Sequence, residues 1–446
     1  MNLLNGDLKK IYLKYLYASF GSALVASIYG VVDMIMVGQY HGPEGSAAMA
    51  VITPIWNILY SFGLLTGIGG SVLFSNLKGK GESQTKQNEY FTIALFLTIL
   101  LSILLWIGLN LYEEPLLKLF GANETLMPLA KRYLLPVRFT VPIFLFTQML
   151  AAFLRNDNDP SLATKAVMAG GMINIFGDYF LVFTCNLGIL GAAIATVGSA
   201  SVSIMVMLTH FGSKNNTLRL VKPTRVLNKT KKIITMGFST FFIDIAMGFL
   251  TMLFNQQIMT YLGTNALAVY GIIVNISTFV QCCGYGIGQA SQPLLTINYG
   301  AKKTQRISQL VNYNFLTVAI VSIVWVLIVT CLPTGLVKLF MTPNEQVLQL
   351  APTIIRVYGL SFLLLPFNVY ATYYFQATLQ PAISFVISLL RGALLSGTLI
   401  LLLPEFFGGQ AIWWAMPLSE LLTGVYVVIM MKKTQKNYLR LSTSAD

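Results

Sequence analysis

The sequence predicts an all-α membrane protein with twelve transmembrane helices, arranged as two pseudo-symmetric six-helix bundles around a central cleft. Three observations support this prediction. The chain of 446 residues is 55% hydrophobic and only 10% charged, whereas soluble domains carry about 25% charged residues. Apolar stretches of about 20 residues, the length that crosses a bilayer as a helix, recur along the chain. Short motifs of the first half return in the second half at a nearly constant offset.

Twelve apolar stretches are bounded by charged residues or by turn residues such as Gly and Pro. Each is long enough to span the hydrocarbon core as a helix that rises ~1.5 Å per residue. The predicted spans are residues 14–37, 51–76, 90–111, 131–153, 164–184, 189–210, 233–260, 266–296, 313–337, 352–375, 384–404 and 411–431.

The distribution of Lys and Arg predicts the orientation. The chain has a net charge of +13, and positive residues of membrane proteins accumulate in cytoplasmic loops. With the N-terminus in the cytoplasm, most basic residues fall in cytoplasmic segments. The outer segments then hold only Lys118, Lys131, Arg132 and Lys338. We therefore expect a multi-pass protein of the cytoplasmic (inner) membrane with both termini in the cytoplasm, and the positive charge requires no nucleic-acid partner.

An internal duplication divides the chain. The sequence LLKLF at Leu116–Phe120 returns as LVKLF at Leu336–Phe340, and Pro160 returns as Pro381, at an offset of about 220 residues. We predict an N-terminal six-helix lobe (1–212), a basic cytoplasmic linker (213–232), and a C-terminal six-helix lobe with a short cytoplasmic tail (233–446). An even number of spans in each repeat gives both halves the same orientation, as in parallel-repeat transporters.

Polar residues at membrane depth mark a candidate site in the first half. A carboxylate there costs roughly 3 kcal/mol or more, so it is a functional candidate by default. Asn174 and Asp178 lie four residues apart and share one face of a helix. Asp33, Ala192 and Thr196 fall at the same level, within a band of roughly 10 Å in the outer half of the membrane. The oxygen atoms suit a proton or a small cation such as Na⁺; alternatively, they only lock helices together by hydrogen bonds.

Other polar residues leave further alternatives open. Tyr29 lies one turn before Asp33, where its hydroxyl could join the network or its ring could simply pack. Asp33 corresponds to Phe254 in the second repeat, so the predicted cation site belongs to the first half alone. Asp244 lies near the centre of the span 233–260. It is a candidate for a second proton site or for a cationic-substrate site, and the alternative is a polar contact between helices.

Two residues of the last spans have opposite charges. Arg391 and Glu420 differ by roughly 6 Å in depth, a gap that the long Arg side chain covers. We expect a buried ion pair, with a structural role and a gating role both open. His41 and His210 lie at span ends, where interfacial hydrogen bonds are expected.

Several motifs resemble those of multidrug and toxic compound extrusion (MATE) transporters, in particular the bacterial type. They are YGVVDMIMVG at Tyr29–Gly38, LRNDNDP at Leu154–Pro160, Asn174 with Asp178, GAAIAT at Gly191–Thr196, and Arg391 with PLSE at Pro417–Glu420. The resemblance covers essentially the whole chain. It implies two six-helix bundles that rock about a central cleft, with an H⁺ or Na⁺ gradient that drives export of organic cations.

The resemblance also implies a ligand set. The N-terminal cation site of the family falls on Asp33, Asn174, Asp178, Thr196 and the backbone oxygen of Ala192, and all but Ala192 offer side-chain oxygens to Na⁺. One departure concerns helix 7. Some members have a proline and then a glutamate there, whereas this chain has Ser239 and an acid, Asp244, about one turn early.

We therefore predict a cation-coupled antiporter that exports amphipathic, often cationic compounds by rocker-switch alternating access. The alternative is a lipid or lipid-linked saccharide flippase, which the few basic residues at membrane depth disfavour. An enzyme is not expected, because the Gly-x-Gly-Asp motif of intramembrane proteases would need glycine at Ile175. We expect no cofactor beyond Na⁺ or H⁺ as the coupling ion, small organic cations or drugs and the bilayer as partners, and a monomer.

Overall fold

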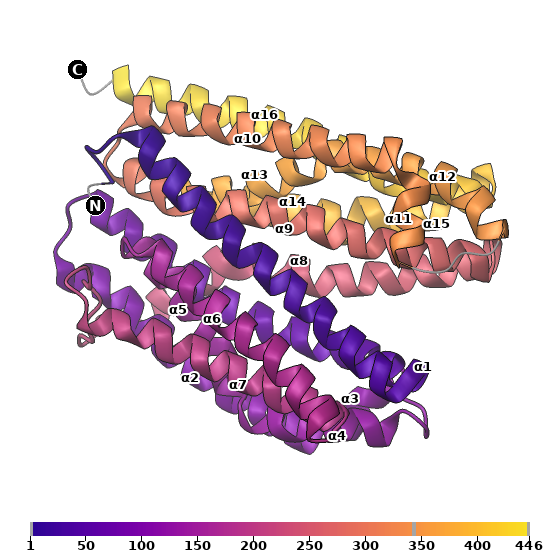
Figure 1. Cartoon of the computed structure of the whole chain (residues 1–446). Helices are drawn as coiled ribbons and strands as arrows, with labels where there is room; N and C mark the ends of the chain where they lie inside the picture. The colour runs from indigo at the N-terminus through magenta and orange to yellow at the C-terminus, as the bar shows by residue number, and fades with distance from the viewer. Residues whose placement is uncertain (1–2, 341–344, 444–446) are drawn as a thin grey trace. The chain divides into compact units, whose positions relative to one another are not determined.

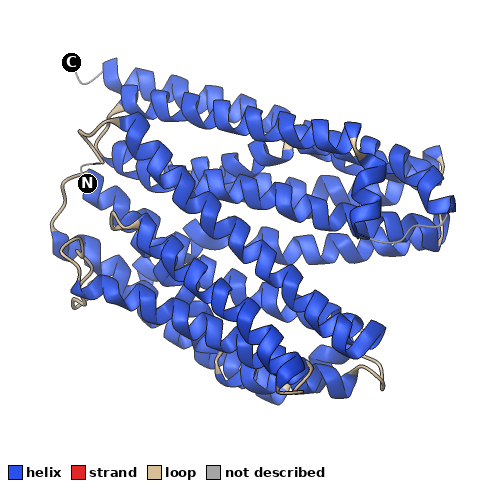
Figure 2. Ribbon diagram, viewed as in Figure 1, coloured by secondary structure: helices blue, strands red, loops and turns tan. Residues whose placement is uncertain are grey.

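The computed structural model describes residues 3–340 and 345–443, and nearly all of them are helical (Figure 2). No strand occurs in these two described ranges. The last residues of the predicted cytoplasmic tail, 444–446, lie outside the described part of the chain. The predicted all-α membrane fold is confirmed.

The N-terminal repeat begins with a very long helix, α1, that contains two of the predicted spans. Gly42 interrupts it with φ +67° and ψ −150°, a backbone conformation that only glycine adopts without strain. The membrane-crossing segments on either side are Leu8–Gly42 and Glu44–Gly79. The helices of this repeat are α1 (Leu8–Gly79), α2 (Gln84–Leu111), α3 (Glu113–Leu119), α4 (Met127–Phe139), α5 (Val141–Asn156), α6 (Pro160–Asp178) and α7 (Ile189–Leu208).

The helices of the C-terminal repeat are α8 (Val226–Tyr261), α9 (Thr264–Gly300), α10 (Thr304–Cys331), α11 (Pro333–Phe340), α12 (Glu345–Gly359), α13 (Leu365–Ala377), α14 (Pro381–Leu389), α15 (Leu395–Phe407) and α16 (Ala415–Thr443) (Figure 1). Those from α12 to α13 and from α14 to α16 continue one another across 3₁₀ or π turns.

Eleven helices of the described residues are long and apolar enough to cross a membrane, or twelve if one bent pair forms a single span. The bent pair is α4 and α5, which meet at 61° and correspond to the predicted span 131–153. Pro136 lies inside α4 and Pro142 in the first turn of α5. Because proline removes a backbone donor and clashes with the preceding turn, it favours a bend here.

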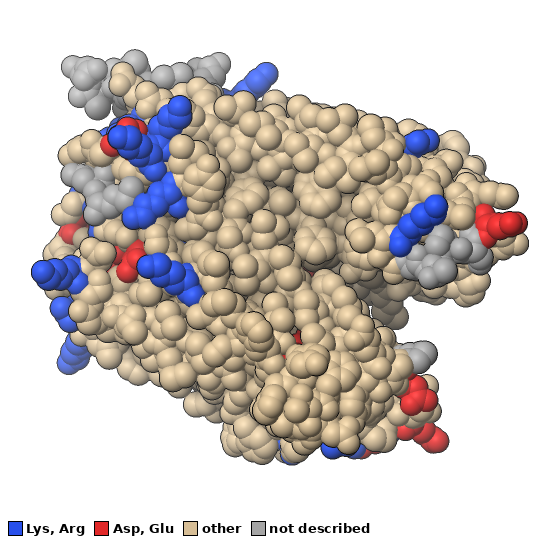
Figure 3. All heavy atoms as spheres, in the orientation of Figure 1, with Lys and Arg blue, Asp and Glu red and all other residues tan. Residues whose placement is uncertain are grey.

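Many predicted span ends differ from the helix ends of the structure by several residues, and two of these differences concern where a span or the linker stops. The span predicted at 313–337 ends at Cys331, because Pro333 begins the separate short helix α11; proline favours the first position of a helix. The residues 226–232 of the predicted linker already belong to α8. Charged side chains gather mainly at helix ends on the face drawn in Figure 3, and the middle of that face is almost free of them. This distribution is that of a multi-pass membrane protein.

The chain packs into two compact units. Unit 1 contains the residues up to Phe241 together with Thr296–Ala301, and unit 2 contains Phe242–Leu295 and the described residues from Lys302 onward. The first six-helix repeat thus lies wholly in unit 1.

A reciprocal pair of glycines joins the ends of α1 and α9 within unit 1. A Cβ added at Gly79 would lie 2.1 Å from the carbonyl oxygen of Ile297, and a Cβ at Gly300 would lie 2.3 Å from the carbonyl oxygen of Asn76. Both distances are far below van der Waals contact. The two backbones therefore touch directly, and each glycine makes room for the other helix.

We predict that Gly79→Ala and Gly300→Ala each destabilise the protein by about 1–3 kcal/mol, because the helix ends must separate to admit a methyl group. Thermal unfolding of the purified protein measures this as a lower Tm. The control is Gly108→Ala in α2, where no atom lies within 4 Å of the new Cβ. Since alanine favours helices over glycine, this control should keep or raise the Tm. Equal melting of Gly79→Ala and the parent protein would contradict the close contact.

Candidate cation and proton site

Three helices of unit 1 bring the predicted site residues together. Asp33 comes from α1, Asn174 and Asp178 come from α6, and Thr196 comes from α7. The side-chain amide of Asn174 donates to the Thr196 hydroxyl over 3.3 Å, and that hydroxyl also interacts with the Asp33 carboxylate. The charge of Asp33 acts on Asp178. Residues distant in sequence thus form one polar cluster among apolar helices.

Several oxygen atoms of this cluster lack a hydrogen-bond donor among the described residues. Asp178 and Asn174 are completely buried, and Asp33 is 6% exposed. Within the described residues, one oxygen of Asp33, both carboxylate oxygens of Asp178 and the amide oxygen of Asn174 have no hydrogen-bond partner. A buried polar atom without a partner is costly, and a buried charge more so. A bound proton or a small cation would satisfy these atoms.

The local backbone positions the acid of α6. Asp178 is the last residue of α6, and the chain continues as a π-helix over Tyr179–Thr184. Such wide turns are frequent at functional sites. Ala192, whose backbone oxygen is an expected ligand, is buried near the start of α7. In a regular helix such a backbone carbonyl accepts a hydrogen bond within the helix itself. Tyr29 interacts electrostatically with Asp33, and its ring lies over Gly171 of α6.

Tyr133 of α4 is a site residue that the sequence did not reveal. Its hydroxyl donates to the second Asp33 oxygen over 3.2 Å, and its ring packs edge-on against Trp56 at 6.4 Å between centroids. It lies near the end of a predicted span, where tyrosine is common. The inward direction of this tyrosine follows from the bend between α4 and α5. The hydropathy pattern does not show that bend, so no signal in the sequence marks Tyr133.

Unit 2 has a separate, half-buried acid. Asp244 of α8 accepts a hydrogen bond of 2.9 Å from the hydroxyl of Tyr285 on α9. Gln281 in turn donates to that hydroxyl over 2.7 Å. The second oxygen of Asp244 has no hydrogen-bond partner among the described residues. Asp244 is therefore a half-satisfied acceptor, held in place by one tyrosine.

Arg391 and Glu420 form a bidentate ion pair in unit 2. Nε and Nη2 of Arg391 lie 3.0 and 2.9 Å from Oε1 of Glu420, and Nε lies 3.1 Å from Oε2. Both side chains are at most 3% exposed. Asn368 adds a third donor to this carboxylate, with a bond of 2.6 Å to Oε2. Arg391 lies in the π-helical turn Leu390–Leu394, between α14 and α15. The pair thus ties that turn to α13 and α16.

No group of three or more His, Cys, Asp or Glu side chains that could hold a metal ion occurs in the described part of the chain. The cluster around Asp33 and Asp178 instead mixes two carboxylates with an amide and a hydroxyl. Hard oxygen donors of this kind suit Na⁺ or a proton rather than a transition metal.

The helical spans and the polar groups buried among them define a multi-pass membrane transporter. Residues 18–180 and 239–399 match the family model described as MatE. The chain therefore belongs to the MatE family, and the match covers corresponding parts of both repeats.

Relatives and solved structures agree with this assignment. The chain is 24% identical over 402 residues to "Multidrug export protein MepA" of Staphylococcus haemolyticus, covering 89% of this chain and 87% of that protein. It is 23% identical over 412 residues to the protein of the same name from Staphylococcus aureus, with 92% and 90% covered. The structure of a multidrug resistance MATE family transporter in an outward-facing conformation matches with a TM-score of 0.90 at 19% identity, covering 98% of both chains. That likeness establishes the shared fold.

We predict that Glu420→Gln destabilises the protein by about 3–5 kcal/mol, because it leaves the buried Arg391 charge without its counter-charge. The double variant Arg391→Met, Glu420→Leu should recover most of the lost Tm if the pair is structural. If Tm recovers while transport stays absent, the pair has a role in transport. The control is Lys118→Ala, which removes an ion pair with Glu114 whose two side chains are 64% and 48% exposed; its cost should be under about 1 kcal/mol. An unchanged Tm for Glu420→Gln would contradict the prediction.

Proposed function

We propose that this protein is an antiporter that exports amphipathic, often cationic organic compounds in exchange for H⁺ or Na⁺. The export function is supported by the relatives named multidrug export protein, and they lend no support to a lipid flippase. The coupling is supported by one observation above all: among the described residues, one oxygen of Asp33, the amide oxygen of Asn174 and both carboxylate oxygens of Asp178 are buried without a hydrogen-bond partner. We further propose a monomer in the cell membrane with both termini in the cytoplasm.

The chemistry of the site suits the exchange of one charge. A proton on one carboxylate makes it a donor to its neighbour, and it relieves the repulsion between Asp33 and Asp178. Na⁺ would do the same work by accepting the same oxygens as ligands. Tyr133 and Thr196 hold Asp33 in either case. The empty, doubly charged state is the unfavourable one, so loading changes the energy of the surrounding helices.

Alternating access then follows from differential binding. If the loaded site favours the inward-facing state and the bound drug favours the outward-facing state, each ligand shifts the equilibrium against the other. Cation loading from outside would promote drug release and return to the inward-facing state by a rocker-switch movement. Asp244 is proposed as a second site, for a proton or for the cationic group of the substrate, because its free oxygen is buried and its other oxygen is fixed by Tyr285.

We predict that Asp178→Asn abolishes ethidium efflux without loss of protein from the membrane. The asparagine amide does not bind a proton near neutral pH. The substitution also removes the negative charge of the carboxylate, which would attract a cation. Efflux from energised cells and quantification of the membrane fraction measure the two properties. The matched control is Glu124→Gln, an exposed acid outside the spans, which should transport normally. Full efflux by Asp178→Asn would show that the coupling site lies elsewhere.

The coupling ion can be identified in proteoliposomes. Efflux is measured under an imposed ΔpH without Na⁺, and under an imposed Na⁺ gradient at equal pH. We expect one gradient, or both, to drive transport by the parent protein and neither to drive it in Asp178→Asn. Transport that is indifferent to both gradients would refute cation coupling.

Substitution of Asp244 should have a different effect. We predict that Asp244→Asn raises the KM for a permanently cationic drug at least severalfold, since a half-buried carboxylate that loses its charge no longer compensates the charge of the drug. The apparent affinity for the coupling ion should stay unchanged. The comparison uses Tyr285→Phe, which keeps the charge and removes the hydroxyl. An unchanged KM in Asp244→Asn would exclude Asp244 from substrate binding.

A further inference from the structure

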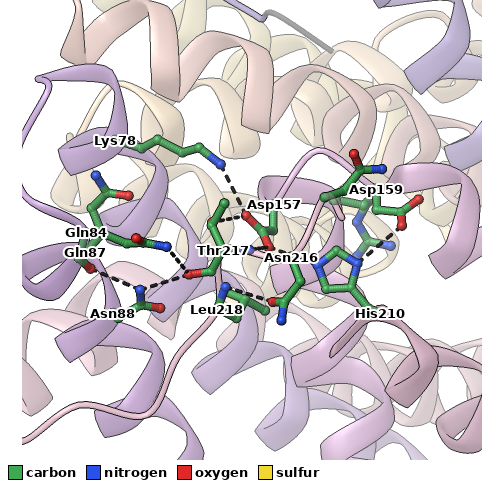
Figure 4. Close-up of polar contacts among 12 residues, drawn as sticks. Lys78, Gln84, Gln87, Asn88, Asp157, Asp159, His210, Asn216, Thr217 and Leu218 are labelled. Carbon is green, nitrogen blue, oxygen red and sulfur yellow. Dashed lines mark hydrogen bonds and ion pairs between the residues drawn. The ribbon is translucent and has the colours of Figure 1, made fainter. Parts of the chain in front are cut away.

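A second buried polar cluster lies in unit 1, at the end where the linker to α8 leaves α7 (Figure 4). His210 follows α7 and is completely buried. Its Nε2 lies 2.9 Å from a carboxylate oxygen of Asp157, and its Nδ1 lies 3.2 Å from a carboxylate oxygen of Asp159. Both acids belong to the connection between α5 and α6. The imidazole therefore bridges two carboxylates with its two ring nitrogens.

The chemistry of imidazole indicates which form fits this place. A neutral imidazole has one N–H donor and one acceptor nitrogen, whereas an ionised carboxylate only accepts. Neutral His210 would thus point a lone pair at one of the two carboxylates. Only the imidazolium donates to both Asp157 and Asp159. The geometry therefore favours the protonated form of His210.

Asp157 also holds the linker. The backbone N–H of Thr217 donates to Oδ2 of Asp157 over 2.8 Å, and the Thr217 hydroxyl donates to Oδ1. Lys78 of α1 lies 3.2 Å from the same Oδ1. Burial alone would raise the pKa of Asp157, but the bonds from His210 and Thr217 and the charge of Lys78 outweigh it and hold that pKa below its usual value. Asp157 is therefore an anion at neutral pH.

From Thr217 the linker runs along the first turns of α2. Alternate backbone groups are bonded: the N–H of Arg219 donates to Asn88 over 2.9 Å, and the N–H of Val221 donates to Thr92 over 3.1 Å. The Thr217 carbonyl accepts from Asn88 at 2.9 Å and from Gln84 at 3.0 Å. Asn88 and Thr92 lie one helical turn apart. The segment is thus fastened to α2 along its length, with Asp157 at its first attachment point.

The remaining titratable and charged groups around the cluster come from α1 and α5. Tyr15 of α1 interacts electrostatically with both Asp157 and Asp159, and its hydroxyl donates to the carbonyl of Arg155. Arg155 of α5 is buried beside these groups, and Lys78 pairs with Asp157. These groups carry fixed charge or none near neutral pH. His210 is therefore the member of the cluster suited to gain and lose a proton in that range.

We infer that Asp157, His210 and Asp159 form a proton-binding site, distinct from the Asp33 and Asp178 site, which fastens the linker to α2 when His210 is protonated. Asp159 also caps α6, since the N–H of Leu162 donates to it. The bound proton thus joins the start of α6, the end of α7 and the linker. When the proton leaves, one of the two bridges becomes repulsive, and the attachment at Asp157 weakens.

Hydrogen exchange tests this inference on the full chain in lipid nanodiscs. Protection factors, corrected for intrinsic exchange, are measured for a peptide that covers Thr217, Arg219 and Val221. The measurement runs from about pH 6 to about pH 9, the range across which an imidazole between carboxylates loses its proton. We expect protection to fall about tenfold as pH rises, the size expected for the loss of one charge-assisted hydrogen bond. Protection that is independent of pH in the parent protein would overturn the inference.

The chain offers a matched control because it has only two histidines. In His210→Gln, protection should be low and independent of pH, since the amide carries no charge. In His41→Gln, the pH dependence should remain as in the parent protein, because His41 contacts Ile189 at the start of α7. A pH dependence that survives in His210→Gln, or that disappears in His41→Gln, would contradict the assignment.

A further variant keeps the test decisive if His210→Gln does not fold. Asp159→Asn retains a good cap for α6 and leaves the bonds between Asp157 and Thr217 intact. It removes one of the two carboxylates that attract the proton. We expect linker protection at low pH as in the parent protein, with the transition moved to lower pH. An unmoved transition would show that Asp159 does not take part in proton binding.

Discussion

The cost of burying charge between helices governs this structure. Among the described residues, the carboxylates at membrane depth fall into two groups: Glu420 is neutralised by Arg391, whereas Asp33, Asp178 and Asp244 each keep at least one oxygen without a hydrogen-bond partner. The first arrangement gives a rigid joint. The second arrangement is costly unless a proton or a small cation binds the free oxygens, because lipid and apolar side chains offer no hydrogen-bond donor. The distribution of satisfied and unsatisfied carboxylates thus separates the frame of the molecule from its candidate working parts.

The two repeats share their helical framework but not their buried carboxylates. Gly79 ends α1 of the first repeat and Gly300 ends α9 of the second, and the two make reciprocal backbone contacts. The carboxylates are not repeated: Asp33 corresponds to the buried Phe254. A proton or cation bound in only one half perturbs one bundle and leaves the other unchanged.

Much of the fold and part of the site could be predicted from the sequence, for physical reasons. Hydrophobic length reports the spans directly, and a carboxylate such as Asp178 stands out because membrane depth makes it expensive. Tyr133 could not be found, because its inward direction depends on the 61° bend between α4 and α5. The link between His210, Asp157 and Thr217 was equally hidden, since it joins three loop segments by side-chain contacts that follow no helical or strand period. Boundaries near proline, such as the end of α10, shifted because turn chemistry outweighs hydropathy there.

The break in α1 has a practical consequence. The first two membrane crossings reverse at Gly42 and Pro43, with helix up to the break on one side and from Glu44 on the other. Because both sides of this break are helical, the connection offers hardly any irregular backbone to an antibody, a protease or an inserted tag. Epitope tagging and limited digestion would therefore be better directed at the longer connection around α3, whose exposed Glu114, Lys118 and Glu124 lie between the third and fourth crossings.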